Sequence, residues 1–140
     1  MAQRRRKPQR SKYAGPHPAF VARPRVVLDA NALMLPFQFR VNLDAELDRL
    51  LGGPEVYVPS SVLRELERLA IRDRTAKSAL RLAAKYKVHE TDASGDGAVI
   101  AAAEALGAHV VTSDRALLEM LRARGILRIT LRSKSHLVLE

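Results

Sequence analysis

The sequence predicts an α/β fold in three layers, with helices covering both faces of a central, mainly parallel sheet. Short β-branched runs alternate with helical patterns of roughly ten residues from residue 25 onward. Strands separated by helices of that length form right-handed β-α-β units, which build parallel sheets. The 140 residues, 47% of them hydrophobic, are enough for one domain with a buried core.

The first half of this region alternates clearly between strand and helix patterns. Residues 25–29 contain a continuous β-branched and apolar run, as expected of a strand buried on both faces. A short helix over 43–51 ends at two glycines, and a second strand covers 55–58. The next predicted elements are a helix that begins at Pro59, Ser60 and Ser61 and runs to 71, a helix over 73–86 and a strand over 88–90.

The second half continues the alternation to the C-terminus. Its predicted elements are a helix over 95–106 that ends at Gly107, a strand over 109–112, a helix over 114–124 that ends at Gly125 and a strand over 126–131. Residues 133–140 either add an edge strand or extend beyond the sheet. The sequence therefore divides into an N-terminal segment over 1–24, a folded domain over 25–132 and this C-terminal extension.

The positive charge of the chain is concentrated at its N-terminus. Eight of the 24 Lys and Arg residues lie in residues 1–25, which contain no acid, so the other 16 nearly balance the 15 Asp and Glu. Like charges and prolines keep this segment from burying enough surface to fold alone, so we expect residues 1–24 to be a disordered arm. Such arms commonly contact polyanions, although a solubilising or localising tail is the alternative. The residues expected to contact nucleic acid are Arg4, Arg5, Arg6, Lys7, Arg10 and Lys12.

Composition excludes several classes of protein. The chain has no cysteine, which excludes disulfides, thiolate zinc sites, Fe–S clusters and a cysteine nucleophile. No apolar run approaches the ~20 residues that span a bilayer, and the N-terminus lacks the apolar segment of a signal peptide. We expect a cytoplasmic protein that does not contact membranes.

Acidic side chains fall where a doubly wound sheet places its ligands, at the carboxyl ends of its strands. Asp29 ends the first strand, and Asp114 follows the strand over 109–112 by two residues. Asp96 and Asp114 also stand in line with the apolar stripe of their helices, which directs them away from the solvent face. Helix capping is the alternative for either acid alone, because an acid in the first turn suits the helix dipole.

A fourth acid comes from the helix that begins at Pro59, but the pattern leaves two choices. Glu65 and Glu67 flank the apolar arc of this helix on opposite edges, and Glu65 could instead pair with Arg68. Carboxylates gathered without cysteine suit a hard cation such as Mg²⁺ or Mn²⁺, which activates water and neutralises charge on phosphoryl oxygens. The four histidines are scattered singly and lack the spacing of zinc ligands.

The segments VVLDAN (26–31), PSSVLREL (59–66) and DGAVIAAAEALGAHVVTSD (96–114) together resemble PIN-domain nucleases over residues 25–132. The resemblance favours Glu65 over Glu67. The sequence departs from this pattern at Gly97, where relatives often carry a second Asp. Asp92 could supply the missing carboxylate. The catalytic and metal-binding residues implied by the resemblance are Asp29, Glu65, Asp96 and Asp114, with Asn31 and Thr112 orienting them.

Residues 32–53 look more like the archaeal branch related to the small-subunit processome endonuclease than like VapC toxins. The function this implies is a Mg²⁺- or Mn²⁺-dependent endoribonuclease that cleaves RNA in rRNA processing and ribosome biogenesis, with pre-rRNA as partner and a homodimer as its assembly. One alternative is an RNA-binding ribosome-assembly factor with little or no turnover. Another is a VapC-type toxin ribonuclease.

Basic and aromatic residues outside the acidic positions supply further candidate RNA contacts. Phe37 and Phe39 could stack unpaired bases, or pack in the core instead. Arg115, next to Asp114, could clamp the scissile phosphate. The polar side of the helix over 73–86 offers phosphate contacts, or merely a solvated face, through Arg74, Lys77 and Arg81.

Overall fold

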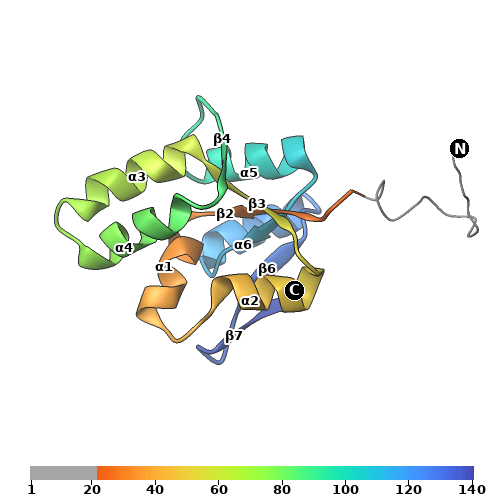
Figure 1. The fold of residues 1–140 in the computed structure, drawn as a ribbon. Coiled ribbons are helices and arrows are strands. Elements are labelled where there is room, and N and C mark those ends of the chain that lie inside the picture. The colour runs from red at the N-terminus through yellow and green to blue at the C-terminus, as the bar shows by residue number, and fades with distance from the viewer. Residues whose placement is uncertain (1–21) are drawn as a thin grey trace, which may run out of the picture.

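The computed structural model describes residues 22–140 (Figure 1). The strands are β2 (Arg25–Leu28), β3 (Glu55–Pro59), β4 (Lys87–His89), β5 (His109–Val111), β6 (Arg128–Arg132) and β7 (His136–Leu139). The helices are α1 (Ala30–Gln38), α2 (Leu43–Leu51), α3 (Ser60–Ala70), α4 (Arg74–Ala83), α5 (Gly95–Leu106) and α6 (Arg115–Ala123). Outside the described residues lie most of the predicted arm and its expected RNA contacts, Arg4, Arg5, Arg6, Lys7, Arg10 and Lys12.

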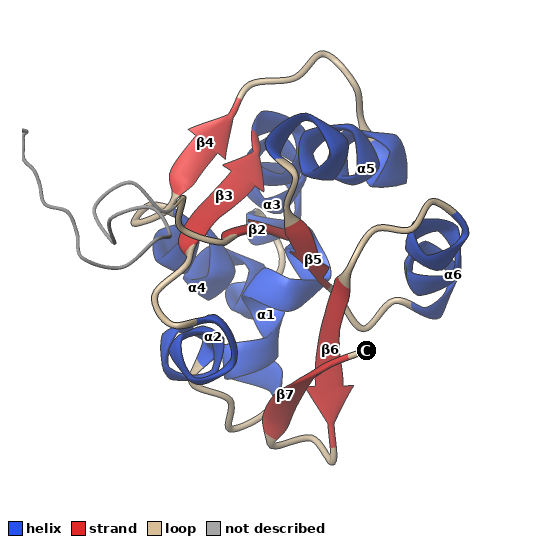
Figure 2. Cartoon of the chain, turned by 90° about the vertical axis from the view of Figure 1, so that its right-hand side faces the viewer, coloured by secondary structure: helices blue, strands red, loops and turns tan. Residues whose placement is uncertain are grey.

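The sheet confirms the predicted α/β class and its mainly parallel order. Its six strands run in the order β4-β3-β2-β5-β6-β7, and only the pair β6 and β7 is antiparallel. β2 occupies the middle, where Val26 is paired with Val56 on one side and with His109 on the other. In Figure 2, α1, α2 and α4 lie on one side of the sheet, and α5 and α6 lie on the other.

The core explains why β2 contains a continuous apolar run. Val26, Val27 and Leu28 are fully buried, because helices cover both faces of the strand. Leu33 of α1 and Leu117 of α6 are also fully buried in the same core. Burying each such side chain contributes about 1.5–3 kcal/mol to folding stability. The acids next to these elements are therefore held by a stable core.

α1 is an element that the sequence patterns did not predict. Asp29 caps its N-terminus, and four apolar side chains in its first six residues are buried. The segment has no polar face that would reveal a helical period, and Pro36 lies inside the helix. The correction matters for function, because α1 begins directly at the first candidate acid.

The C-terminal residues form β7, which is held from both sides. One side pairs with β6, and Leu137 is fully buried. On the other side, the Leu137 N–H donates to Glu46 Oε1 (2.8 Å), and Arg49 Nη2 donates to the Leu137 carbonyl (2.7 Å). The α2 side chains thereby occupy the outward N–H and carbonyl of Leu137 in this edge strand.

Within residues 22–140, none of the helices has the length and apolar character needed to cross a bilayer.

Candidate active site

A cavity of about 170 Å³ lies at the carboxyl ends of the central strands. Four separate elements each supply it with one acid: Asp29 follows β2, Glu65 belongs to α3, Asp96 to the first turn of α5, and Asp114 precedes α6. The structure therefore brings all four predicted acids to one cavity. Their roles in catalysis and metal binding stay predictions.

Asp29 is the most buried of the four acids, with only 8% of its surface exposed. Its Oδ1 accepts a hydrogen bond from the Ala32 N–H (2.7 Å), and its Oδ2 accepts one from the Thr112 hydroxyl (2.6 Å). Burial raises the pKa of Asp29 to about 6, against the lowering effect of these two hydrogen bonds. The charges of Asp114 and Asp96 make smaller contributions to this raised pKa.

The loop after β5 is tied to the start of α1. The Thr112 hydroxyl accepts from the Asp114 N–H (3.1 Å), and Asp114 Oδ1 accepts from the Leu117 N–H (3.0 Å), which caps α6. Asn31 Oδ1 accepts from both the N–H (2.8 Å) and the hydroxyl (2.9 Å) of Ser113. Thr112 thus orients Asp29 directly, and Asn31 fixes the loop that carries Asp114. Asp114 therefore both caps α6 and lines the cavity, so the two roles considered for it are compatible.

The remaining two acids enter the cavity from α3 and α5. Glu65 lines the cavity, whereas Glu67 is exposed and does not, so the choice that the helix pattern left open has a geometric answer. Asp96 lies in the first turn of α5, and its side chain does not cap the helix. Partial burial, followed by the charge of Asp114, raises the pKa of Asp96.

Ser61 lines the same cavity and was not among the predicted site residues. It is buried, and its hydroxyl has no hydrogen-bond partner. A signal for it was present in the sequence: Ser61 lies four residues before Glu65 and therefore on the same helix face. Ser113 was also missed, and no spacing rule marks it.

The donors around the cavity fit a hard divalent cation in type. Carboxylates are the ligands that Mg²⁺ and Mn²⁺ prefer. A cation would relieve the mutual repulsion that adds to burial in raising the pKa values of Asp29 and Asp96. The unpartnered Ser61 hydroxyl adds one more oxygen. As placed, no three acidic or histidine side chains in residues 22–140 stand close enough together to hold a metal ion, so side-chain rotation would have to complete the coordination.

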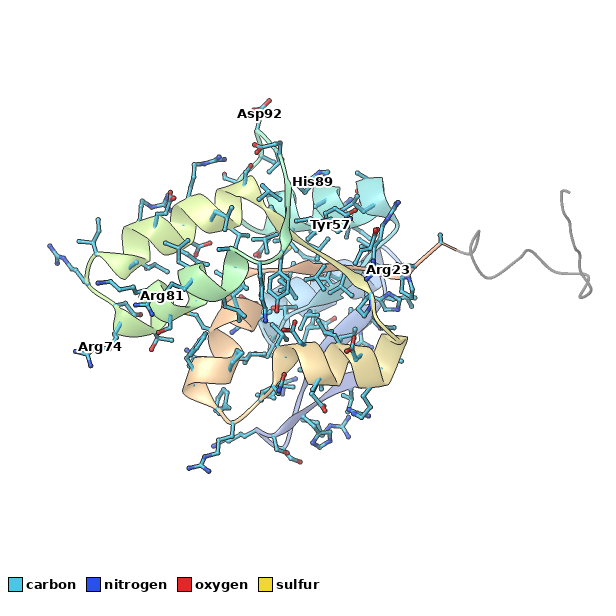
Figure 3. All side chains as sticks on the ribbon, in the orientation of Figure 1. Arg23, Tyr57, Arg74, Arg81, His89 and Asp92 are labelled. Carbon is cyan, nitrogen blue, oxygen red and sulfur yellow. The ribbon has the colours of Figure 1, made fainter. Side chains whose placement is uncertain are left out.

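Other predicted site residues lie away from the cavity. Arg115 is exposed at the start of α6, and Asp92 projects from the loop before α5, as Figure 3 shows. Phe39 packs partly buried against the core, whereas Phe37 is half exposed. The cations on the exposed side of α4, which do not line the cavity either, are Arg74, Lys77 and Arg81.

Comparisons with known proteins agree with this architecture. A family model described as a PIN like domain matches residues 26–134. Ribonuclease VapC9 of Archaeoglobus fulgidus is 34% identical over 105 residues, which cover 71% of this chain and 77% of that protein. The structure of the PIN domain endonuclease Utp24 superposes with a TM-score of 0.71 at 21% identity, over 83% of this chain and 90% of that one.

A second solved structure, a domain of a functionally unknown protein from Methanocaldococcus jannaschii, superposes with a TM-score of 0.58. It is 16% identical and covers 79% of this chain and 92% of its own. At these identities the two structural likenesses concern the fold.

Proposed function

This chain belongs to the PIN-like domain family, and from that premise we propose that it is a metal-dependent endoribonuclease. The observation that carries the proposal is the convergence of Asp29, Glu65, Asp96 and Asp114 on one cavity. Support for RNA as the substrate comes from the similarity to a curated ribonuclease and from the basic N-terminal sequence. A divalent cation held by these acids, Mg²⁺ or Mn²⁺, would supply activated water and neutralise phosphoryl charge.

The chain's own residues would divide the work as follows. Asp29 and Asp114 would hold the cation, and the Thr112 hydroxyl links the two residues by donating to the Asp29 carboxylate and accepting from the Asp114 N–H. Asp96 would complete the set from the start of α5, and Glu65 would bind a second ion or position the attacking water. Asn31 would keep the loop at Ser113 in place, so that Asp114 stays aligned with Asp29.

We further propose that the RNA is precursor rRNA. Support comes from the sequence of residues 32–53 and from the eight cations in residues 1–25, which suit a large structured RNA. A toxin ribonuclease is the second candidate, favoured by the 34% identity to Ribonuclease VapC9. Growth arrest on expression, relieved by Asp96→Asn, would support the toxin. Normal growth together with selective cleavage of precursor rRNA would support rRNA processing.

The direct test is cleavage of single-stranded RNA and precursor rRNA with Mg²⁺, with Mn²⁺ and with EDTA. We expect cleavage only with metal, and none from the Asp96→Asn variant, whose circular dichroism spectrum should remain that of a folded chain. Binding without metal-dependent cleavage would contradict the proposal and identify an RNA-binding assembly factor. Cleavage by Asp96→Asn at the parent rate would show that the site is wrongly assigned.

A further inference from the structure

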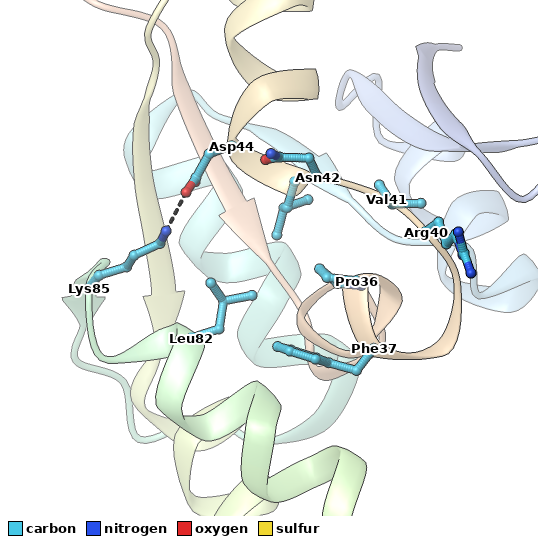
Figure 4. Close-up of a pocket in the computed structure, with 9 residues that line it drawn as sticks. Pro36, Phe37, Arg40, Val41, Asn42, Asp44, Leu82 and Lys85 are labelled. Atoms are coloured by element: carbon cyan, nitrogen blue, oxygen red, sulfur yellow. Dashed lines mark hydrogen bonds and ion pairs between the residues drawn. The ribbon is translucent and has the colours of Figure 1, made fainter.

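A second hollow, of about 460 Å³, lies between the C-terminal end of α1, the loop after it and the C-terminal end of α4 (Figure 4). It shares no lining residue with the acidic cavity. Helix α1 connects the two: Asp29 caps its first turn and Phe37 lies in its last, about 12 Å further along the helix axis. The hollow is of the size that small ligands and cofactors occupy in proteins, ~300–1,000 Å³.

Phe37 gives this hollow an open aromatic wall. Phe37 is 46% exposed, although aromatic residues of that size usually bury most of their surface. In Figure 4 the ring extends from α1 toward Leu82 of α4, and Pro36 and Val41 complete the apolar lining. A flat, partly open aromatic surface next to aliphatic side chains suits the face of a nucleobase.

The charges at the rim suit a phosphate. The one carboxylate in the hollow, Asp44, is already occupied by an ion pair with Lys85 and a hydrogen bond from the Tyr86 hydroxyl (2.7 Å). Arg40 is exposed at the rim and has no hydrogen-bond or ion-pair partner within residues 22–140. The hollow therefore presents an aromatic face together with one uncommitted positive charge.

The same positive charge continues along α4. Arg81 lies in the last turn of α4, next in sequence to Leu82 of the hollow and four residues before Lys85, which follows in the turn after the helix. Lys77 and Arg74 lie on the same helix face as Arg81, at spacings of four and three. Figure 3 shows Arg74 extending away from the body of the protein, and none of the three has a partner among the described residues.

We propose that this hollow binds one unpaired nucleotide of an RNA strand, with the base on Phe37 and a phosphate on Arg40. Neighbouring phosphates then follow Arg81, Lys77 and Arg74 along α4. The inference rests on the proposed function, because it takes RNA as the substrate. It adds a site for holding the strand, separate from the acidic cavity and joined to it by α1.

The test measures RNA binding in EDTA, where cleavage is not expected. The probe is a short single-stranded RNA that contains 2-aminopurine, whose fluorescence falls when it stacks on an aromatic ring. Phe37→Leu removes the ring but keeps an apolar side chain of similar size, and Phe37→Ala removes both. We expect each variant to weaken RNA binding roughly fivefold to tenfold, which is the low end of the effect of losing one base stacked on an aromatic ring. Each variant should also abolish the quenching of 2-aminopurine.

Leu127→Ala serves as the matched control. Leu127 is 57% exposed and lines a different hollow, beside Gly125 and His109, so its variant should bind and quench like the parent. Arg40→Gln should reduce the slope of log affinity against log salt by about 0.7, the value for one phosphate on a single strand. Unchanged affinity and quenching in Phe37→Leu would overturn the proposal. The alternative occupant of the hollow is an acidic protein. If Phe37→Leu weakened binding of an acidic protein but left RNA binding unchanged, the proposal would also be overturned.

Cleavage of the same RNA with Mn²⁺ separates this inference from the proposed function. If the parent chain cleaves RNA but Phe37→Leu binds it unchanged, only the hollow is wrongly assigned. If the parent chain neither cleaves nor binds RNA, the proposed function fails as well.

Discussion

Replacing Asp29 with asparagine should stabilise the metal-free chain at neutral pH and destabilise it in acid. Burial raises the pKa of Asp29 from 3.8 to about 6 in the folded chain. A carboxyl group with a higher pKa when folded stabilises the fold below its unfolded pKa, and that contribution is lost as the pH rises through its folded pKa. The loss between pH 3.8 and about 6 corresponds to about 3 kcal/mol.

The asparagine variant carries no charge and escapes this loss. Its Oδ1 can still accept from the Ala32 N–H, but its amide nitrogen cannot accept from the Thr112 hydroxyl. The amide nitrogen can instead donate to the Thr112 oxygen, but the Thr112 hydroxyl proton then lacks its acceptor, at a cost of about 1 kcal/mol at every pH. We therefore expect the variant to be about 1 kcal/mol less stable than the parent near pH 3.5 and about 2 kcal/mol more stable near pH 7.5.

Urea denaturation in EDTA, followed by circular dichroism across this pH range, measures the difference in unfolding free energy. Asp48→Asn is the control, because Asp48 is exposed and its side chain makes no hydrogen bond within residues 22–140. Its effect should stay within about 0.5 kcal/mol at each pH. A difference for Asp29→Asn that does not change with pH would refute the reasoning. Adding metal at 100 times its Kd should then stabilise the parent by about 2.7 kcal/mol and the variant by much less.

Three further predictions concern catalysis, the arm and the edge strand. Glu65→Gln should slow metal-dependent cleavage of a short RNA by about a hundredfold or more, and Glu67→Gln should not, because only Glu65 lines the cavity; equal rates would contradict the assignment. Deleting residues 1–22 removes six cations and should flatten the slope of log RNA affinity against log salt by about 4 if all six contact phosphates. The rate of cleavage at saturating RNA should not change. An unaltered slope would exclude phosphate contacts by these residues. Hydrogen bonds from Arg49 and from the Leu137 N–H lower the pKa of Glu46 to about 2, so its contribution to stability is present above pH 4.5 and lost as the pH falls toward 2. Glu46→Gln should therefore lose about 1 kcal/mol at neutral pH, because solvent screens the half-exposed Arg49 partner. The variant should also depend less on pH in acid than the parent, and parallel acid-denaturation curves would contradict this.

The sequence predicted those helices and strands whose hydrophobic pattern reflects which of their faces are buried. The strand over 25–29 was recognisable because β2 is buried on both faces and reads as one apolar run. Helix α1 was not, because its buried residues leave no polar face and Pro36 suggests an interruption. Periodicity records the contrast between a wet and a dry side, and α1 has little of that contrast.

The candidate site divides in a similar way. Asp29 and Asp114 could be placed from the chain alone, since the carboxyl ends of parallel strands meet at one edge. Glu65 could not be separated from Glu67, because a helix wheel does not say how the helix is rotated against its neighbours. Ser61 and the Phe37 hollow depend on how α3 and α4 pack, which no local pattern encodes.

The hydrogen bonds between α2 and Leu137 of β7 also affect whether copies of this chain can associate through their edge strands. An open edge strand is a template for pairing with another chain, and RNA that attracts a basic protein raises its local concentration. Here Glu46 and Arg49 use up the outward N–H and carbonyl of Leu137, so a neighbouring strand finds no free backbone groups at that residue. The opposite edge, β4, is only three residues long. Part of the β7 edge is thereby closed to pairing with a strand of another copy.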